Sequence, residues 1–182
     1  RSGDWFRSHG VYTEDTVNAS FSPSRKHSEI TIPQGTYKFT TMEIGPNFSQ
    51  KRKLASDIML KLGSYYTGRK YSLIAKSRFS PLGRFLVQAD INANWIQLPG
   101  ANFNITTVSA RGLYSFNTDF FIKLFAQWNN DKETAGINFL LNYRYKPGSD
   151  LFLVYDNGFT ASDRLRQKNR TILLKLAHLF PL

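Results

Sequence analysis

Few residues of this chain fall into a pattern that would perform catalysis. The three histidines, His9, His27 and His178, are far apart in the sequence. A catalytic histidine must lie within hydrogen-bonding reach of a nucleophile and of an orienting group, and nothing in the sequence brings one to a serine and an aspartate. Glu14 and Asp15 could form an acid/base pair, but solvated turn carboxylates are the simpler interpretation. We therefore identify no catalytic residues.

Candidate metal ligands are equally sparse. Asn129, Asp131 and Glu133 offer the oxygen atoms that calcium prefers, but they lack the glycine and the spacing of an EF-hand loop. The chain has no cysteine, which removes thiolate metal sites, disulfides and thiol catalysis. A glycine-rich phosphate loop is also missing. The sequence therefore gives no reason to expect a metal or a cofactor.

Positive charge is a strong compositional signal. The 24 Lys and Arg residues exceed the 13 Asp and Glu residues, giving a net charge of +11. Such a balance suits nucleic acid, anionic lipid headgroups or an anion-lined pore as partners. Cations gather at 51–53 and over 164–170, next to a polar stretch, 157–168, that is predicted to be a long loop.

The elements that would position these residues are long strands. From 120 to 128, and again from 137 to 146, apolar residues alternate with partly polar ones, and a period of two is typical of a strand with two different faces. The predicted apolar faces carry Ile58, Leu60, Ile91, Trp95, Phe120, Ile122, Leu124, Trp128, Phe139, Leu141, Ile172 and Leu174. The predicted polar faces carry Lys61, Asp90, Lys123, Arg144 and Lys175.

Turn signals separate these strands at regular intervals. Turn centres recur roughly every 14 to 18 residues, whereas soluble sandwiches space their turns by about 8 to 12. The pattern predicts an all-β, antiparallel up-and-down meander of about nine to ten long strands. Residues 1–35 are weakly patterned and are expected to be loop or strand, whereas 36–182 are expected to form a β-barrel.

The length of the strands favours a membrane location. The longest apolar run, Leu151–Tyr155, is too short for a transmembrane helix, but strands of about 10 residues can cross a bilayer as a barrel. The high aromatic content, 15%, fits the aromatic girdles of such barrels. The apolar faces would then meet lipid, and the polar faces would line the lumen. Because an open sheet has costly edges, the strands either close among themselves or pair with strands outside this chain.

Several segments resemble one bacterial family. They are Phe79–Pro81, Trp95–Gly100 with Phe103, Phe125–Asn129, Ile137–Phe139, Tyr143–Tyr155 and Arg170–Lys175. The chain from about Gly35 onward resembles the C-terminal β-barrel domain of unknown function designated DUF5916. The resemblance implies a bacterial outer-membrane barrel downstream of a carbohydrate-binding module similar to family 9. It implies no reaction, and this chain would be a fragment of a longer protein.

These observations give one leading hypothesis and two alternatives. The leading one is a bacterial outer-membrane β-barrel domain that anchors an N-terminal carbohydrate-binding module and binds or passes a solute. Its partners would be outer-membrane lipid and lipopolysaccharide, whose phosphates would meet loop cations, and carbohydrate through the upstream module; no nucleic acid is expected. The alternatives are a soluble basic β-barrel that binds nucleic acid or another polyanion, and an outer-membrane hydrolase.

Overall fold

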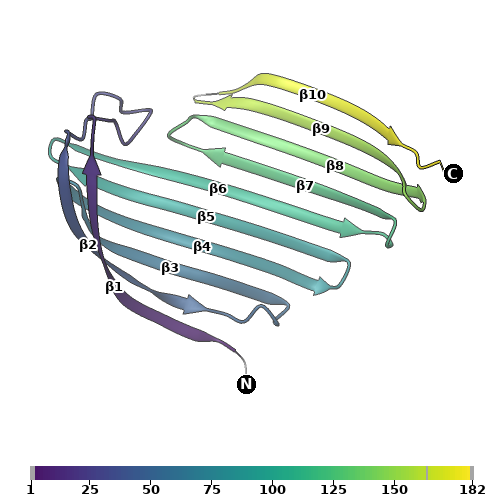
Figure 1. Ribbon diagram of the computed structural model, residues 1–182, viewed down its shortest axis with the longest axis horizontal. Helices are drawn as coiled ribbons and strands as arrows, with labels where there is room; N and C mark the ends of the chain where they lie inside the picture. Colours follow the sequence, from purple (N-terminus) through teal and green to yellow (C-terminus); the bar gives the residue numbers. More distant parts are fainter. Residues whose placement is uncertain (1–2, 163, 181–182) are drawn as a thin grey trace.

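The chain folds into one antiparallel sheet of ten strands. The computed structural model describes residues 3–162 and 164–180. The strands are β1 (Trp5–Val17), β2 (Gly35–Asn47), β3 (Leu54–Tyr65), β4 (Gly68–Leu82), β5 (Phe85–Leu98), β6 (Ala101–Ser115), β7 (Phe120–Asn129), β8 (Thr134–Lys146), β9 (Ser149–Ala161) and β10 (Leu165–Ala177). Each strand pairs with the next one in the sequence (Figure 1). The predicted all-β up-and-down meander is therefore confirmed.

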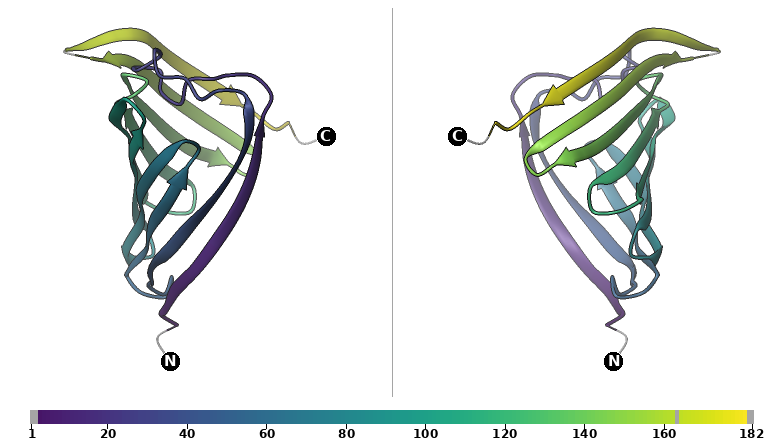
Figure 2. Two further views of the ribbon diagram at one scale, coloured as in Figure 1. Left: turned by 90° about the vertical axis from the view of Figure 1, so that its left-hand side faces the viewer. Right: turned by 90° about the vertical axis from the view of Figure 1, so that its right-hand side faces the viewer.

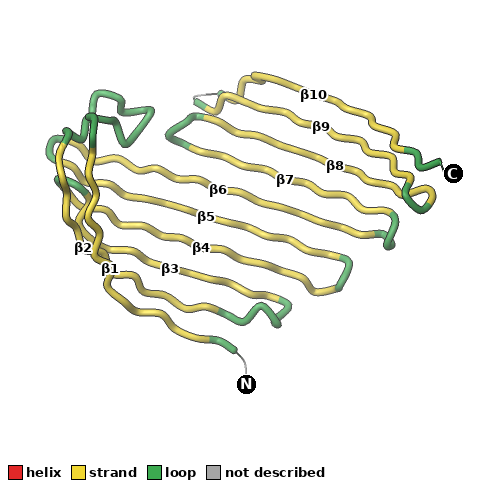
Figure 3. Tube along the Cα trace, viewed as in Figure 1, coloured by secondary structure: helices red, strands yellow, loops and turns green. Residues whose placement is uncertain are grey.

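The described residues contain strands, loops and turns only (Figure 3). They include no helix that is long and apolar enough to cross a membrane. The period-two alternation explains why the strands form, and tight turns explain where they stop. Gly148, with φ at 75°, follows Pro147 in the β8–β9 turn, where proline presets one backbone angle and glycine accepts the left-handed one.

The sheet is strongly curved and has two free edges. Figure 2 shows the strands wrapping around an open interior. Within the part of the chain that the structure describes, β1 and β10 are the edges of the sheet and do not pair with each other. The two faces of the sheet are therefore a concave face and a convex face, and the sheet forms a trough rather than a closed cylinder.

The up-and-down order sorts the connections between two ends of the trough. One end, here called the loop rim, holds 18–34, 66–67, 99–100, 130–133 and the β9–β10 connection. The other end, the turn rim, holds 48–53, 83–84, 116–119 and 147–148. Because the number of strands is even, β1 starts and β10 ends at the turn rim. The longest connection, 18–34, lies at the loop rim (Figure 1).

Buried apolar side chains are few for a chain of this length. Among the described residues the buried apolar side chains are Val17, Ile32, Ala55, Ala93, Ile96, Leu98 and Phe103. A soluble single domain of this size buries roughly 70% of its unfolded surface, which needs a larger core. Ile96, Leu98 and Phe103 form one small cluster on the concave face, against which Ile30 of the 18–34 loop packs.

The structure defines one weakly patterned segment and corrects the expectation for another. The weakly patterned residues 1–35 contain β1, which pairs with β2 along its whole length, followed by the 18–34 loop. The predicted long loop over 157–168 is wrong, because β9 continues to Ala161 and β10 begins at Leu165. The β9–β10 ladder continues there with a register shift between Gln167 and Asn169. The ends of these two strands are polar, and for this reason the sequence did not reveal that they are extended.

Candidate functional site: an apolar convex face and a polar concave wall

The strand register fixes which residues share a face. Directly paired residues of neighbouring antiparallel strands lie on the same side of a sheet. One row running across β5 to β10 contains Val87, Gly112, Leu124, Phe139, Tyr155 and Ile172. A row shifted by one residue contains Leu86, Leu113, Lys123, Leu140, Val154 and Leu173. The first row belongs to an almost entirely apolar face and the second to a mixed face.

Every residue of the two sequence-predicted sets falls on the side expected from the alternation. Ile58, Leu60, Ile91, Trp95, Phe120, Ile122, Leu124, Trp128, Phe139, Leu141, Ile172 and Leu174 share the apolar face. Lys61, Asp90, Lys123, Arg144 and Lys175 share the other, polar face. Contact of these faces with lipid and with a lumen stays a prediction.

Exposure identifies the apolar face as the convex one. Side chains on a concave face converge and shield each other, whereas those on a convex face spread apart. Ser72 and Asn142 on the polar face are 3% and 5% exposed, whereas Leu60 and Leu124 on the apolar face are 44% and 50% exposed. Large apolar side chains therefore face outward, and none of the other strands covers them.

Aromatic rings form two bands across the apolar face. Near the turn rim, an unbroken series of ring contacts joins four strands and one turn. Its members are Phe85, Tyr114, Phe116, Phe120 and Tyr143, with successive centroids 6.4, 4.8, 4.4 and 5.9 Å apart. Toward the loop rim, Trp95 pairs with Tyr71 across β4 and β5, and Trp128 lies on the same face. Aliphatic residues occupy the space between the two bands.

Charges on the polar face largely compensate one another near β1 to β3. The Nζ atom of Lys61 is 2.6 Å from Glu43, which also lies 3.5 Å from the ring of His9. The guanidinium of Arg7 is 2.5 Å from Asp57. Farther along the sheet, Arg144 approaches Asp150 at 3.6 Å. This part of the wall is a set of paired charges, as expected for a filled barrel interior.

Aromatic rings also occur on the polar face. Cations lie over rings at Arg111–Phe125, Lys123–Phe121 and Lys175–Phe152, at 5.5, 5.0 and 6.0 Å from the ring centroids. Aromatic rings and cations therefore share the polar face from β6 to β10. A cation over the face of an aromatic ring is attracted by the ring quadrupole, so these cations are held without a carboxylate.

The 18–34 loop is anchored to the β7–β8 connection by Asp131. The carboxylate of Asp131 accepts the backbone N–H groups of Arg25 and Lys26, at 3.0 and 3.2 Å, and the hydroxyl of Ser24. Lys26 also pairs with Glu133 at 3.0 Å. Burial alone would raise the pKa of Asp131, but the hydrogen bonds from Arg25, Ser24 and Lys26 outweigh it and lower the pKa. The loop thus crosses the loop rim of the trough.

These contacts also account for the residues that could have bound calcium. Asp131 and Glu133 are engaged by the loop, and the side-chain oxygen of Asn129 accepts the Lys132 N–H at 2.6 Å. The adjacent carboxylates Glu14 and Asp15 are similarly separated. Glu14 pairs with Lys38 across the β1–β2 ladder, and Asp15 accepts the Tyr66 hydroxyl at 2.7 Å. Neither pair presents two free carboxylates to a common substrate.

Tyr66 lies at the centre of an aromatic cluster that sequence reasoning missed. Its ring contacts those of Phe21, Tyr37, Phe39 and Tyr65. Burial, together with the hydrogen bond to Asp15, raises the pKa of Tyr66 to about 12. The cluster joins the 18–34 loop to the β3–β4 turn. No local sequence pattern predicts contacts between segments so far apart in the chain.

The structure brings one histidine close to a serine. His178 Nδ1 lies 3.4 Å from Ser149 Oγ and 2.8 Å from the Tyr145 hydroxyl, and its ring stacks on Tyr145. Ser149 is only 1% exposed, and its hydroxyl accepts the N–H of Leu179. A hydroxyl that is buried and engaged in this way cannot reach a substrate, so this trio fastens the segment after β10 to the β8–β9 turn.

Comparisons with known proteins add little to this description. No family model matches the chain, so the likeness to DUF5916 stays a resemblance. A search of curated proteins also found no match. Among solved structures, the chain is similar to that of the NanC porin, with a TM-score of 0.40 and 12% identity over 85% of this chain and 84% of that chain. A likeness of this size assigns no solute and no location to this chain.

Proposed function

We propose that this chain forms the wall of a bacterial outer-membrane β-barrel. The observation that carries the proposal is the apolar convex face, bounded on both sides by aromatic rings, with the charged residues of β3 to β9 mostly on the concave side. Among these strands as the structure describes them, Arg69, near the start of β4, is the one charged residue on the convex face. Transmembrane barrels show this division between lipid-facing and lumen-facing residues.

The height of the apolar face supports this proposal. Phe120 and Trp128 stand at the two ends of the apolar face of β7, with Leu124 midway between them. Eight residues of antiparallel strand span about 27 Å at about 3.4 Å per residue. A tilt of about 40° reduces that span to about 21 Å along the membrane normal, close to the apolar band of about 25 Å in such barrels.

The two rims support an orientation. Outer-membrane barrels have short periplasmic turns and longer extracellular loops. The turn rim would then face the periplasm, and the loop rim, with the 18–34 loop, would face the cell exterior. Arg166, Lys168 and Arg170, near the loop rim, would meet lipopolysaccharide phosphates as charge-assisted pairs.

Residence in lipid imposes one further requirement. Unpaired backbone groups do not occur against hydrocarbon, so the β1 and β10 edges must be covered there, by each other, by further strands or by another copy. Anchoring of a carbohydrate-binding module, which the DUF5916 resemblance implies, belongs to the same proposal and concerns sequence outside this chain.

Spin-label accessibility tests the proposal directly, because the chain has no cysteine. A nitroxide would be attached to Leu124→Cys on the apolar face and, separately, to Lys123→Cys on the polar face. In vesicles, the label at position 124 should collide with oxygen, which concentrates in lipid, and the label at 123 with a water-soluble nickel complex. Equal accessibility to both quenchers at the two positions would refute the membrane assignment.

A second candidate function is binding of a polyanion on the concave face. The interleaving of Arg111, Lys123 and Lys175 with aromatic rings favours it, since such surfaces stack bases and contact phosphates. Binding of single-stranded oligonucleotides that weakens steeply with added salt would support this function. Absence of binding at low salt would exclude it.

A further inference from the structure

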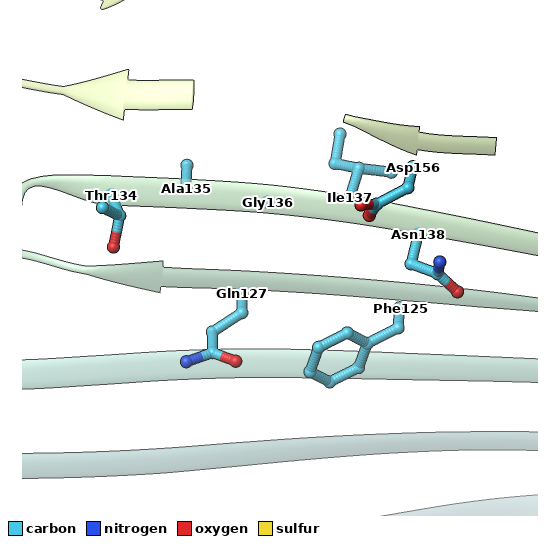
Figure 4. A pocket seen from close by; sticks show the side chains of 8 residues that line it. All are labelled: Phe125, Gln127, Thr134, Ala135, Gly136, Ile137, Asn138 and Asp156. Carbon is cyan, nitrogen blue, oxygen red and sulfur yellow. The ribbon is translucent and has the colours of Figure 1, made fainter. Parts of the chain in front are cut away.

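The polar face contains a hollow lined by polar side chains that have no partner. It encloses about 250 Å³ between β7, β8 and β9. Figure 4 shows Phe125 and Gln127 from β7, Thr134 and Asn138 from β8, and Asp156 from β9 around it. Among the described residues, the side chains of Gln127, Asn138 and Asp156 make no hydrogen bond or ion pair with the protein. Three unengaged polar groups thus meet in one hollow.

Elsewhere on this face, several polar side chains satisfy each other. Ser72 donates to Asn94 at 2.8 Å, and Asn129 donates to Thr107 at 2.7 Å. The charged pairs near β1 to β3 are closed in the same way. At the hollow, two amides and a carboxylate have no partner within the described part of the chain and remain available to another molecule.

A glycine provides the floor of the hollow. Gly136 pairs with Gly158 on the neighbouring strand, so two successive positions of the wall carry no side chain. A Cβ atom added at Gly136 would meet only the carbonyl oxygen of Asn157, at 3.9 Å. The backbone therefore does not require glycine here, and the missing side chain leaves room for a ligand.

The lining determines the chemistry of the ligand. Phe125 offers a ring face, two amides offer both donors and acceptors, and the Asp156 carboxylate offers acceptors only. A nearby cation, Arg111, is held over Phe125. This set suits a ligand with an apolar ring face and several hydroxyls. It disfavours anions, because of Asp156, and metal ions, because only one carboxylate is present.

We propose that the hollow binds a neutral pyranose sugar ring. Phe125 stacks on the C–H face of the sugar, and Gln127, Asn138 and Asp156 bind its hydroxyls. The volume lies just below the usual range of about 300 to 1,000 Å³ for drug-sized ligands, which fits a single ring. The inference deepens the proposed function by naming the class of solute that the concave wall would meet, but binding itself does not require a membrane.

Saturation-transfer NMR on the folded full chain in detergent tests the site. The probes are methyl glucopyranoside, with glucuronate as an anionic ring and sorbitol as a polyol without a ring face. Methyl glucopyranoside should receive saturation on its ring C–H protons and bind at least tenfold more tightly than either of the other two. No transfer to this probe, or equal binding of glucuronate or sorbitol, would overturn the proposal.

Matched variants separate the site from the surrounding wall. Phe125→Leu should weaken binding about tenfold, as expected when a stacked ring is lost. Gly136→Ala should weaken it by a similar factor, and the free space around its Cβ preserves the fold. Phe121→Leu removes another ring of the same strand and face, also beneath a cation, and should leave binding unchanged. Equal effects at positions 121 and 125 would show nonspecific contact and refute the site.

This experiment is independent of the membrane proposal. Sugar binding in detergent with equal quencher accessibility at positions 123 and 124 would support the site and refute the outer-membrane assignment. No sugar binding, together with oxygen accessibility at position 124 and nickel accessibility at position 123, would support the barrel wall and refute the sugar site.

Discussion

Replacing Leu124 by arginine should reveal what solvates the convex face. Leu124 lies midway along β7, with Gly112 and Phe139 as its direct cross-strand neighbours. It is half-exposed, and its neighbours provide no carboxylate for a new cation. The substitution Leu124→Arg therefore changes mainly the interaction between this position and whatever surrounds the sheet.

The two environments predict different magnitudes. Phe120 and Trp128 are four residues on either side of Leu124, so in a bilayer this position is at the midplane, where arginine costs about 2 to 4 kcal/mol. In water, a surface substitution away from special features usually changes stability by less than about 0.5 kcal/mol. The difference of at least about 1.5 kcal/mol is more than tenfold in the unfolding equilibrium.

Denaturant unfolding in phospholipid vesicles measures this difference. Tryptophan fluorescence would follow the transition, and linear extrapolation would give the free energy of unfolding. The control is Leu140→Arg, the same exchange on the polar face of the adjacent strand, opposite Lys123. Repulsion between like charges directly across a ladder should cost up to about 1 kcal/mol there.

The relative loss of unfolding free energy in the two variants shows whether the convex face lies in hydrocarbon. Leu124→Arg should be the more destabilising by about 1 kcal/mol or more. If Leu124→Arg costs no more than Leu140→Arg, the convex face is not in hydrocarbon, and the assignment of the two faces to lipid and lumen fails.

Three further predictions concern the loop rim and the strand ladder. Asp131→Ala should weaken docking of the 18–34 loop by about 1 to 3 kcal/mol, since hydrogen bonds to a charged group are lost, and trypsin should then cleave after Arg25 several-fold faster. The pKa of Asp131 is lowered in the folded state. Docking of the loop should therefore be fully stable above pH 3.8, the ordinary pKa of this carboxyl, and be lost as the pH falls through the lowered pKa. Pepsin cleavage of the loop that does not change over this pH range would contradict the prediction. Gly45→Ala should destabilise the β2–β3 ladder by more than about 1 kcal/mol, as expected for overpacking, because its Cβ would overlap the carbonyl oxygen of Ile58. Gly10→Ala, with open space around it, should be neutral in the same unfolding assay.

The sequence was most informative where one face of a strand is uniformly apolar. The alternation over 120–128 and 137–146 predicted both the strands and the division of their faces, because period two is a local property. For β1 the choice between strand and loop stayed open because its convex positions include Ser8, Gly10 and Glu14, which give no apolar stripe. The 157–168 stretch was wrongly predicted to be a loop for a related reason. Its strand ends are polar, and their pairing depends on backbone hydrogen bonds, which leave no pattern in the sequence.

The long-range features could not be predicted from local patterns. The capture of the 18–34 loop by Asp131 joins residues more than 100 positions apart, and no spacing rule encodes it. The hollow depends on Gly136 and Gly158 meeting across a ladder, which only the register reveals.

The attachment of the 18–34 loop has a geometric consequence for the whole sheet. The loop leaves the wall between β1 and β2 and is tied to the wall again between β7 and β8. It is thus a chord drawn across an arc of strands, and for an arc of given length the chord fixes the radius. The carboxylates of Asp131 and Glu133 therefore help to set the curvature of the trough, and a cut in this loop would let the sheet relax toward a flatter shape.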